Sequence, residues 1–376
     1  MTYIHERAGW PKLTWDLAAL ATLLAQVRGR QGRLLGRMEA IGFDLRAEAS
    51  LATLTDDVVK SSAIEGENLN RDEVRSSLAL RLGVDAAGLP AAGRDVEGIV
   101  EMMLDATQNY SAALTAERLY DWHAALFPTG RSFMRKIAVG AWRPREAGPM
   151  QVVSGPYGRE RVHFEAPEAE RLEAEMSAFL EWFNGPESEP AKIDPMLKSG
   201  IAHFWFVTIH PFEDGNGRIA RAIADLALAR ADDCRERFYS MSAQIEVDRR
   251  QYYTELEGQQ RGELDITPWL GWFLGCLDRA LGRADTALSS VLDKARLWDK
   301  INKSPVNDRQ RLVISRLFDD FRGHLSTAKY AKLAKCSTDT ALRDIQMLVD
   351  HAILIRNPGG GRSTSYRLAR PDELPA

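Results

Sequence analysis

The segment His210–Arg221 concentrates side chains that could activate a hydroxyl group and bind a metal ion. His210 follows an apolar stretch, and a histidine, whose unperturbed pKa lies near neutrality, can remove the proton of an attacking hydroxyl. Asp214 offers a hard oxygen ligand, which suits an Mg²⁺ ion that bridges phosphate groups. A base and a metal ligand so close in the chain indicate transfer of a phosphoryl or nucleotidyl group.

The same segment also carries the parts of an anion-binding site. Gly215 and Gly217 can adopt backbone angles that let several N–H groups point into one concavity, and helical periodicity begins at this point. Amide groups at the N-terminus of a helix bind anions. Arg218 and Arg221 share one face of that helix, so both can donate to phosphate oxygens. We therefore predict a phosphate-binding site at this helix start.

Helical periodicity predicts the elements that position these residues. One predicted helix, 193–208, leads into His210, and another, 216–230, begins at the glycines. Prolines and glycines cluster in the segment 140–167, which predicts a β-hairpin or an extended flap. Strand and helix patterns do not alternate, which argues against a parallel α/β fold and for a mainly α protein. The other predicted helices cover 17–38, 51–60, 72 onward, 95–109, 116–127, 169–183, 248–258 and 268–287.

The composition changes after Ser304-Pro305. Between Val306 and Arg370 there are 12 Lys and Arg against 6 Asp and Glu, a local charge of 12 − 6 = +6. Three helical patterns, two short strands and a glycine-rich turn follow in the order of a winged helix-turn-helix domain. These elements cover 308–322, 327–334, 337–351, 353–355, 358–361 and 365–368.

Composition places the chain among ordinary globular proteins. It has 376 residues, 45% apolar and 27% charged, with a formal net charge of −4. This balance excludes a disordered chain and gives the whole molecule no strong bias toward nucleic acid. Three widely spaced cysteines cannot form a disulfide framework, and no segment resembles a signal peptide or a membrane span. We therefore expect a soluble cytoplasmic protein of two or three domains.

Residues 210–221 read H-P-F-E-D-G-N-G-R-I-A-R, which matches the H-P-F-x-D/E-G-N-G-R-x-x-R pattern of Fic (Fido-fold) proteins at every fixed position. The resemblance implies a helical core with a small β-hairpin flap, and the transfer of AMP from ATP to Ser, Thr or Tyr of a target protein, with release of pyrophosphate. It implies that His210 is the general base and that Asp214 holds Mg²⁺. Family members that phosphorylate carry Lys at the position of Gly217, so glycine favours AMP transfer. The nucleotide phosphates would contact Gly215, Asn216, Gly217, Arg218 and Arg221.

Two further stretches resemble the family less specifically. Met150, Gln151, Val152 and Val153 resemble the part of the flap that pairs with an extended segment of the target. Tyr252, Tyr253 and Gln260 lie where the family places its adenine pocket. An equally open interpretation is that the two tyrosines only pack their helix against its neighbours and do not bind adenine.

The segment Ser61–Gly66 resembles the family's inhibitory helix motif, S/T-x-x-x-E-G/N. Ser61 and Glu65 share a helix face, and Gly66 allows the helix to end directly afterwards. The resemblance implies that Glu65 pairs with Arg221, takes the place of the γ-phosphate and so prevents productive binding of ATP. The same carboxylate could position a water molecule that removes AMP, so de-adenylylation remains an alternative.

These features predict three regions and leave the function of the last one open. They are an N-terminal helical region with the inhibitory helix (1–95), a Fic catalytic domain (96–290) and a winged helix-turn-helix domain (305–370). Arg356, Arg362 and Arg367 could contact DNA phosphates, although such domains also dock proteins or form homodimers. The competing hypotheses are an autoinhibited protein adenylyltransferase, which could modify itself, and a DNA-binding regulator whose Fic domain senses a nucleotide. The presence of both His210 and Asp214 favours the enzyme.

Overall fold

The computed structural model describes residues 2–84, 89–155, 159, 161–185, 193–319, 324–358, 364–369 and 373. The chain divides into two compact units, residues 1–284 and 285–376. The boundary falls inside one long helix, α11 (Thr267–Lys303). This division differs from the three predicted regions, whose limits stay a prediction.

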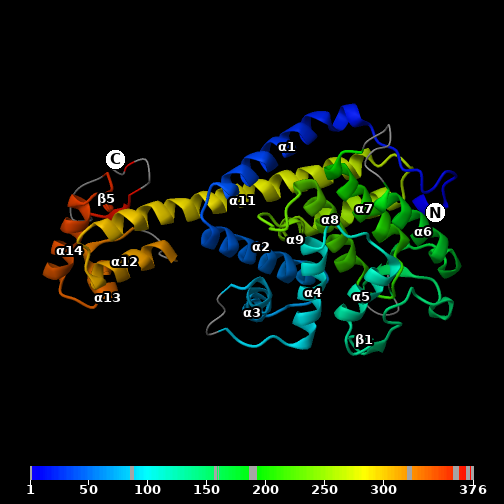
Figure 1. Ribbon diagram of the computed structural model, residues 1–376, viewed down its shortest axis with the longest axis horizontal. Helices are drawn as coiled ribbons and strands as arrows, with labels where there is room; N and C mark the ends of the chain where they lie inside the picture. Colours follow the sequence, from blue (N-terminus) through cyan, green and yellow to red (C-terminus); the bar gives the residue numbers. More distant parts are fainter. Residues whose placement is uncertain are drawn as a thin grey trace. The chain divides into compact units, whose positions relative to one another are not determined.

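Helices make up most of the first unit, which confirms the predicted mainly α class (Figure 1). None of the described helices is both long enough and apolar enough to cross a membrane. Besides α11 and the short 3-10 turns η1 (Ile4–Glu6), η2 (Arg145–Ala147) and η3 (Ala169–Arg171), the helices are α1 (Leu17–Glu39), α2 (Phe43–Ile64), α3 (Arg71–Leu82), α4 (Arg94–Gln108), α5 (Ala116–Leu126), α6 (Leu172–Asn184), α7 (Pro195–Ile209), α8 (Asn216–Asp232), α9 (Met241–Val247) and α10 (Arg249–Gln260).

Helices α7 and α8 form the centre of the first unit and have the most extensive packing of any two elements. Apart from Pro195 and Lys198, α7 is buried on every side, which its apolar sequence allows. Helix α2 packs against α9 and also touches α8. Helix α1 lies alongside α11, where Gln26 donates a 2.9 Å hydrogen bond to Asp278 (Figure 1). The two helices that flank the predicted site are therefore embedded in the core.

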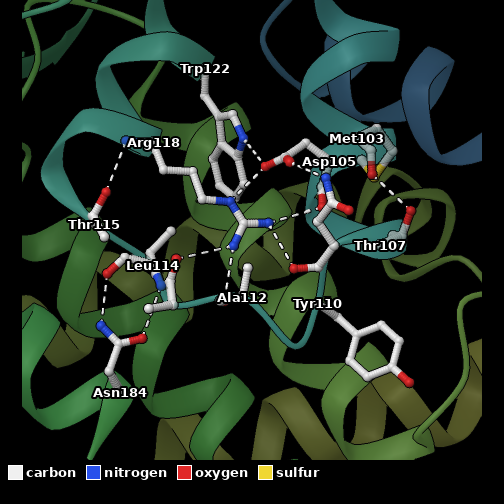
Figure 2. A network of polar contacts seen from close by, with 12 residues as sticks. Met103, Asp105, Thr107, Tyr110, Ala112, Leu114, Thr115, Arg118, Trp122 and Asn184 are labelled. Atoms are coloured by element: carbon white, nitrogen blue, oxygen red, sulfur yellow. Dashed lines mark hydrogen bonds and ion pairs between the residues drawn. The ribbon is translucent and has the colours of Figure 1, made fainter.

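A polar network holds the connection between α4 and α5 (Figure 2). The Oδ2 atom of Asp105 accepts hydrogen bonds from Nε of Arg118 at 2.6 Å and from Nε1 of Trp122 at 2.7 Å. Arg118 also donates to three backbone carbonyl oxygens of this connection and to the carbonyl oxygen of Asp105 in α4. Asn184 at the end of α6 bonds both the backbone N–H and the carbonyl of Leu114. The network positions α5, which packs against α8.

The strands of the first unit form two small antiparallel hairpins. The hairpin of β3 (Gln151–Ser154) and β4 (Arg161–Glu165) lies in the predicted flap, with an irregular register after Val152. The hairpin of β1 (Arg131–Ser132) and β2 (Arg135–Lys136) was not predicted. Strands of two residues are too short to show an alternating pattern in the sequence.

The second unit contains α12 (Asp308–Asp319), α13 (Thr327–Ala334), α14 (Thr338–Asp350), and the antiparallel strands β5 (Leu354–Arg356) and β6 (Tyr366–Leu368). Leu297 and Ile301 of α11 belong to its apolar core. The helix predicted over 268–287 therefore continues to Lys303, because these two apolar residues have their partners in the second unit. Residues 359–361 of the predicted turn lie outside the described residues.

Candidate active site

His210 directly follows α7 in a left-handed backbone conformation with φ 52°. This conformation is uncommon for a residue other than glycine, and surrounding contacts must maintain it. Arg143, which is 3% exposed, donates from Nε to the carbonyl of His210 at 2.9 Å and from its backbone N–H to the carbonyl of Pro211 at 2.8 Å. Its Nη2 donates to the carbonyl of Pro167. Arg143 thus ties the histidine to the end of the flap.

The imidazole of His210 is held by a hydrogen bond to its own helix. Its Nδ1 lies 3.1 Å from the carbonyl oxygen of Val207, and since a carbonyl oxygen only accepts, Nδ1 carries the proton and Nε2 keeps its lone pair. Burial lowers the pKa of His210, and the positive charge of Arg143 lowers it further. The ring is therefore neutral at neutral pH and can accept a proton.

Asn216 and His123 shape the loop between α7 and α8. Asn216 accepts from the backbone N–H of Phe212 at 2.9 Å and donates to its carbonyl at 2.8 Å. The Phe212 ring stacks on the His123 ring at 4.2 Å. Gly215 has φ +79°, and a Cβ atom there would lie 2.9 Å from the ring of Phe127. The stretch Gly215–Gly217 is predicted to contact phosphate, and within it the side chain of Asn216 closes the loop.

Asp214 lies in this loop with both carboxylate oxygens in hydrogen bonds. Oδ1 accepts from the backbone N–H of Gly215 at 2.6 Å, and Oδ2 accepts from the hydroxyl of Ser132 in β1. No group of three or more His, Cys, Asp or Glu side chains among the described residues could hold a metal ion. A single carboxylate nevertheless fits Mg²⁺, which usually binds one or two carboxylates together with the phosphates of a substrate.

Arg221 and Glu65 form an ion pair in which the arginine is buried and the glutamate is partly exposed. Nη2 of Arg221 lies 2.9 Å from Oε1 of Glu65, and the arginine side chain is 1% exposed. Arg221 also donates to the hydroxyl of Ser61 at 2.9 Å and to its carbonyl at 2.8 Å. Burial alone would lower the pKa of Arg221, but Glu65, Tyr252 and Tyr253 together raise it. The structure thus brings together three residues that the sequence singled out from two distant segments.

Gly217 lies directly beneath the Glu65 carboxylate. A Cβ atom on Gly217 would lie 2.1 Å from Oε1 of Glu65, far closer than any real contact. The missing side chain therefore leaves space for a carboxylate at the start of α8. A phosphate group could approach the helix N-terminus in the same way.

Arg218 is also buried and also paired with an acid. Its Nη1 lies 2.6 Å from Oε2 of Glu67, and its guanidinium lies 5.1 Å from the centre of the Phe127 ring. Burial raises the pKa of Glu67, although Arg218 acts in the opposite direction. Glu67 was not predicted as a site residue, and its only signal in the sequence is its position just after Gly66.

The three residues of the predicted adenine pocket lie on α10 in different environments. Tyr252 is 2% exposed and shares a 3.0 Å hydrogen bond with Nε2 of His203. The hydroxyl of Tyr253 donates to the carbonyl of Ile64 at the end of α2, at 3.3 Å. Gln260 is buried and donates to Thr208. Both tyrosines lie close to Arg221, but an adenine pocket stays a prediction.

The flap offers an open strand edge. Among the described residues β3 pairs only with β4, so its other edge carries no strand. Met150 accepts from the backbone N–H of Ala166 at 2.9 Å, Gln151 and Val152 pair with β4, and Val153 is 47% exposed. An extended peptide could add to this edge, as expected for a target segment.

The basic residues predicted to contact DNA lie in the second unit. Arg367 donates to both carboxylate oxygens of Glu373 at 2.6 Å, and Arg356 donates to Thr364. Arg362 lies outside the described residues. The pairing of Arg367 reduces the positive charge available to a phosphate, and DNA binding stays a prediction.

Two residues of the site gave no recognisable signal as site residues. Arg143 lies within the predicted flap segment 140–167, but neither Arg143 nor His123 was predicted as a site residue. Nδ1 of His123 accepts from the backbone N–H of Gly140 at 3.2 Å, so α5 is bonded to the start of the flap. Burial lowers the pKa of His123 to about 4. A buried neutral histidine cannot be distinguished from an exposed one by local sequence.

Comparisons with known proteins give matches to both segments that form this site, the end of α2 and residues 210–221. Residues 113–228 match the model of the Fic/DOC family, and residues 3–84 match a domain of unknown function (DUF4172). The protein adenylyltransferase fic-1 of Caenorhabditis elegans is 25% identical over 241 residues, which are 63% of this chain and 43% of that protein. The protein adenylyltransferase Fic of Nematostella vectensis is 33% identical over 115 residues, 31% of this chain and 25% of that protein.

A solved structure shares the fold over nearly the whole chain. The crystal structure of a Fic family protein from Desulfovibrio desulfuricans G20 has a TM-score of 0.53 and 20% identity, and the alignment covers 96% of this chain and 98% of that one. The segments matched in the two curated relatives span less than half of those proteins. Together with the geometry around His210 and α8, these matches show that the chain carries a domain of the Fic/DOC family over residues 113–228.

Proposed function

We propose that the protein is an autoinhibited protein adenylyltransferase, which transfers AMP from ATP to a hydroxyl group of a Ser, Thr or Tyr side chain in a target protein. The main support is one arrangement in the structure. A neutral histidine with a free Nε2 precedes a helix N-terminus that carries two buried arginines. The curated relatives, which are named protein adenylyltransferases, support the same reaction.

In the proposed reaction the hydroxyl oxygen of the target attacks the α-phosphorus of ATP. Nε2 of His210 takes the hydroxyl proton as the new P–O bond forms. The bond from the α-phosphorus to the oxygen that bridges to the β-phosphorus breaks, and pyrophosphate leaves. Backbone N–H groups at Gly215–Gly217 and the guanidinium groups of Arg218 and Arg221 would hold the phosphates.

Asp214 is the residue that would hold Mg²⁺. The ion, when bound, would neutralise negative charge on the phosphates. Arg143 keeps His210 in its left-handed conformation and so determines where Nε2 points. The open edge of β3 would align an extended segment of the target.

Glu65 accounts for the inhibition in this proposal. Its carboxylate pairs with Arg221 and fills the space next to Gly217. In this proposal a phosphate of ATP has to lie in that space. Replacing Glu65 with glycine would free a buried arginine and remove a negative charge from a phosphate-binding site. We therefore expect Glu65→Gly to raise AMP transfer strongly.

The test compares ATP labelled with ³²P at the α-position and at the γ-position, incubated with a cell lysate. The proteins are wild type, Glu65→Gly and Glu65→Gly/His210→Ala. We expect protein-bound label from the α-position only, strong with Glu65→Gly and reduced about 10²–10⁴-fold by His210→Ala. Label from the γ-position would mean phosphorylation. Absence of label from both positions would contradict the proposal and favour the DNA-binding alternative.

De-adenylylation is tested with the same proteins. A substrate that has been labelled with α-³²P by Glu65→Gly is purified and mixed with the wild-type protein. Release of labelled AMP by wild type but not by Glu65→Gly would assign the reverse reaction to Glu65. If the substrate keeps its label in the presence of the wild-type protein, Glu65 does not support removal of AMP and acts only as an inhibitor.

A further inference from the structure

Two acids from one short segment face two arginines of α8. Glu65 pairs with Arg221 at 2.9 Å, and Glu67 pairs with Arg218 at 2.6 Å. The resemblance to inhibitory motifs covers only the first pair. The second pair is closer than the first, and its arginine is almost as buried, at 3% exposure of the side chain.

The end of α2 determines where Glu67 lies. The backbone N–H of Glu67 bonds the carbonyl of Ser62 at 3.0 Å, and the N–H of Gly66 bonds the carbonyl of Ala63 at 3.0 Å. This pair of hydrogen bonds, with Gly66 at φ +88°, is the Schellman arrangement that ends many helices. The chain reversal at Gly66 therefore directs both acids toward α8 from a fixed helix end.

Arg218 retains an unused donor in this arrangement. Its Nε is buried and has no hydrogen-bond partner among the described residues. A buried guanidinium nitrogen without an acceptor costs free energy. A phosphate group has several acceptor oxygens and could accept a hydrogen bond from this nitrogen as well. Burial also raises the pKa of Glu67, so the charged carboxylate of Glu67 is less stable in this site than in water.

We propose that Glu67 closes a second phosphate subsite at Arg218, separately from the subsite that Glu65 closes at Arg221. This inference rests on the proposed function, because it assumes that a nucleotide polyphosphate binds at the start of α8. Removing Glu65 then opens only one of the two subsites. In a chain that lacks Glu65, Glu67 therefore limits the affinity for nucleotides with β- and γ-phosphates.

The test measures nucleotide binding by the full chain with isothermal titration calorimetry. The proteins are Glu65→Gly, Glu65→Gly/Glu67→Gln and Glu65→Gly/Glu67→Asp, and the ligands are ATP, ADP and AMP with Mg²⁺. We expect Glu67→Gln to tighten binding of ATP at least tenfold and of ADP in the same direction, while AMP binding stays within twofold. Glu67→Asp keeps the charge but shortens the side chain, so its ATP affinity should fall between the other two.

The matched control is Glu65→Gly/Glu48→Gln. Glu48 lies in the first half of α2, far from the helix end that precedes Glu65, and it pairs with an arginine of α3, Arg75. We expect this variant to bind ATP as Glu65→Gly does. Circular dichroism of every variant checks that the helical content is unchanged.

Two results would overturn the inference. Equal ATP affinity for Glu65→Gly and Glu65→Gly/Glu67→Gln would mean that Glu67 only neutralises Arg218. An equal increase in the affinity for AMP would mean that the effect of Glu67 does not depend on the β- and γ-phosphates. Failure of the proposed function is seen separately: tighter ATP binding without any AMP transfer would contradict the enzyme and leave the second subsite intact.

Discussion

At the scale of single residues, the Glu65 carboxylate lies so close to Gly217 that it leaves no space for a side chain at position 217. Gly217 has an ordinary helical backbone, so an alanine is not disfavoured there by its φ angle. The cost of a side chain at this position therefore depends on whether Glu65 is present.

Gly217→Ala tests this dependence. We expect it to lower the free energy of unfolding by about 1–3 kcal/mol in the wild-type chain, because the new methyl group forces Glu65 away from Arg221. In the Glu65→Gly chain the same change should be neutral or slightly stabilising, because alanine favours a helix over glycine. Urea unfolding of the four proteins gives the coupling energy. An equal cost in both chains would place the clash elsewhere.

At the scale of elements, the site depends on bonds between segments that are far apart in the chain. His123 joins α5 to the flap through Gly140 and to the loop after α7 through Phe212. Arg143 joins the flap to His210. These contacts hold His210, the turn at Gly215 and the edge of β3 in one arrangement, although no single element contains all three.

The buried His123 makes this arrangement sensitive to pH. Its side chain is fully buried and its pKa is about 4, against 6.5 for an unperturbed histidine. The neutral form is the one that fits, so its contribution to stability is complete above pH 6.5 and is lost as the pH falls toward 4. Between pH 7 and pH 5 this loss amounts to about 2 kcal/mol.

His123→Asn should remove this part of the pH dependence. Asparagine keeps an acceptor for Gly140 but does not titrate. We expect the variant to be less stable at pH 7, because the ring stacking is lost, but to lose about 2 kcal/mol less than wild type between pH 7 and pH 5. Urea unfolding followed by tryptophan fluorescence measures both values. The control His324→Asn, at an exposed histidine of the second unit, should behave as wild type; an unchanged pH dependence in His123→Asn would contradict the prediction.

At the scale of the whole molecule, α11 contributes to both compact units. Its residues up to Ala284 belong to the first unit, and Leu297 and Ile301, with 2% and 0% exposure, belong to the core of the second. The predicted start of a C-terminal domain at residue 305 would remove these two side chains from that core.

Two fragments test where the second unit begins. A fragment of residues 285–376 should fold and unfold cooperatively, because it keeps Leu297 and Ile301. A fragment of residues 305–376 lacks both and should lose several kcal/mol of stability, since the loss of one large apolar core side chain costs about 2–5 kcal/mol. Circular dichroism during heating compares them. Equal melting curves would show that the end of α11 is dispensable for this unit.

The sequence alone determined the features that depend on neighbouring residues. Helical periodicity predicted most helices, because amphipathic spacing is local. The order of residues in 210–221 predicted the helix end, the turn and the helix start that form the site. The position of Glu65 at the end of α2 followed from the Ser61–Gly66 motif in the same way.

Only the tertiary structure decided which of these residues meet. Glu65 and Arg221 are separated by more than 150 residues, and their contact depends on how α2 packs against α8 and α9. The pair of Glu67 with Arg218, the support of His210 by Arg143 and the extension of α11 also depend on packing between distant segments. Local sequence patterns set the conformation of a segment, whereas these contacts arise from burying several segments against one another.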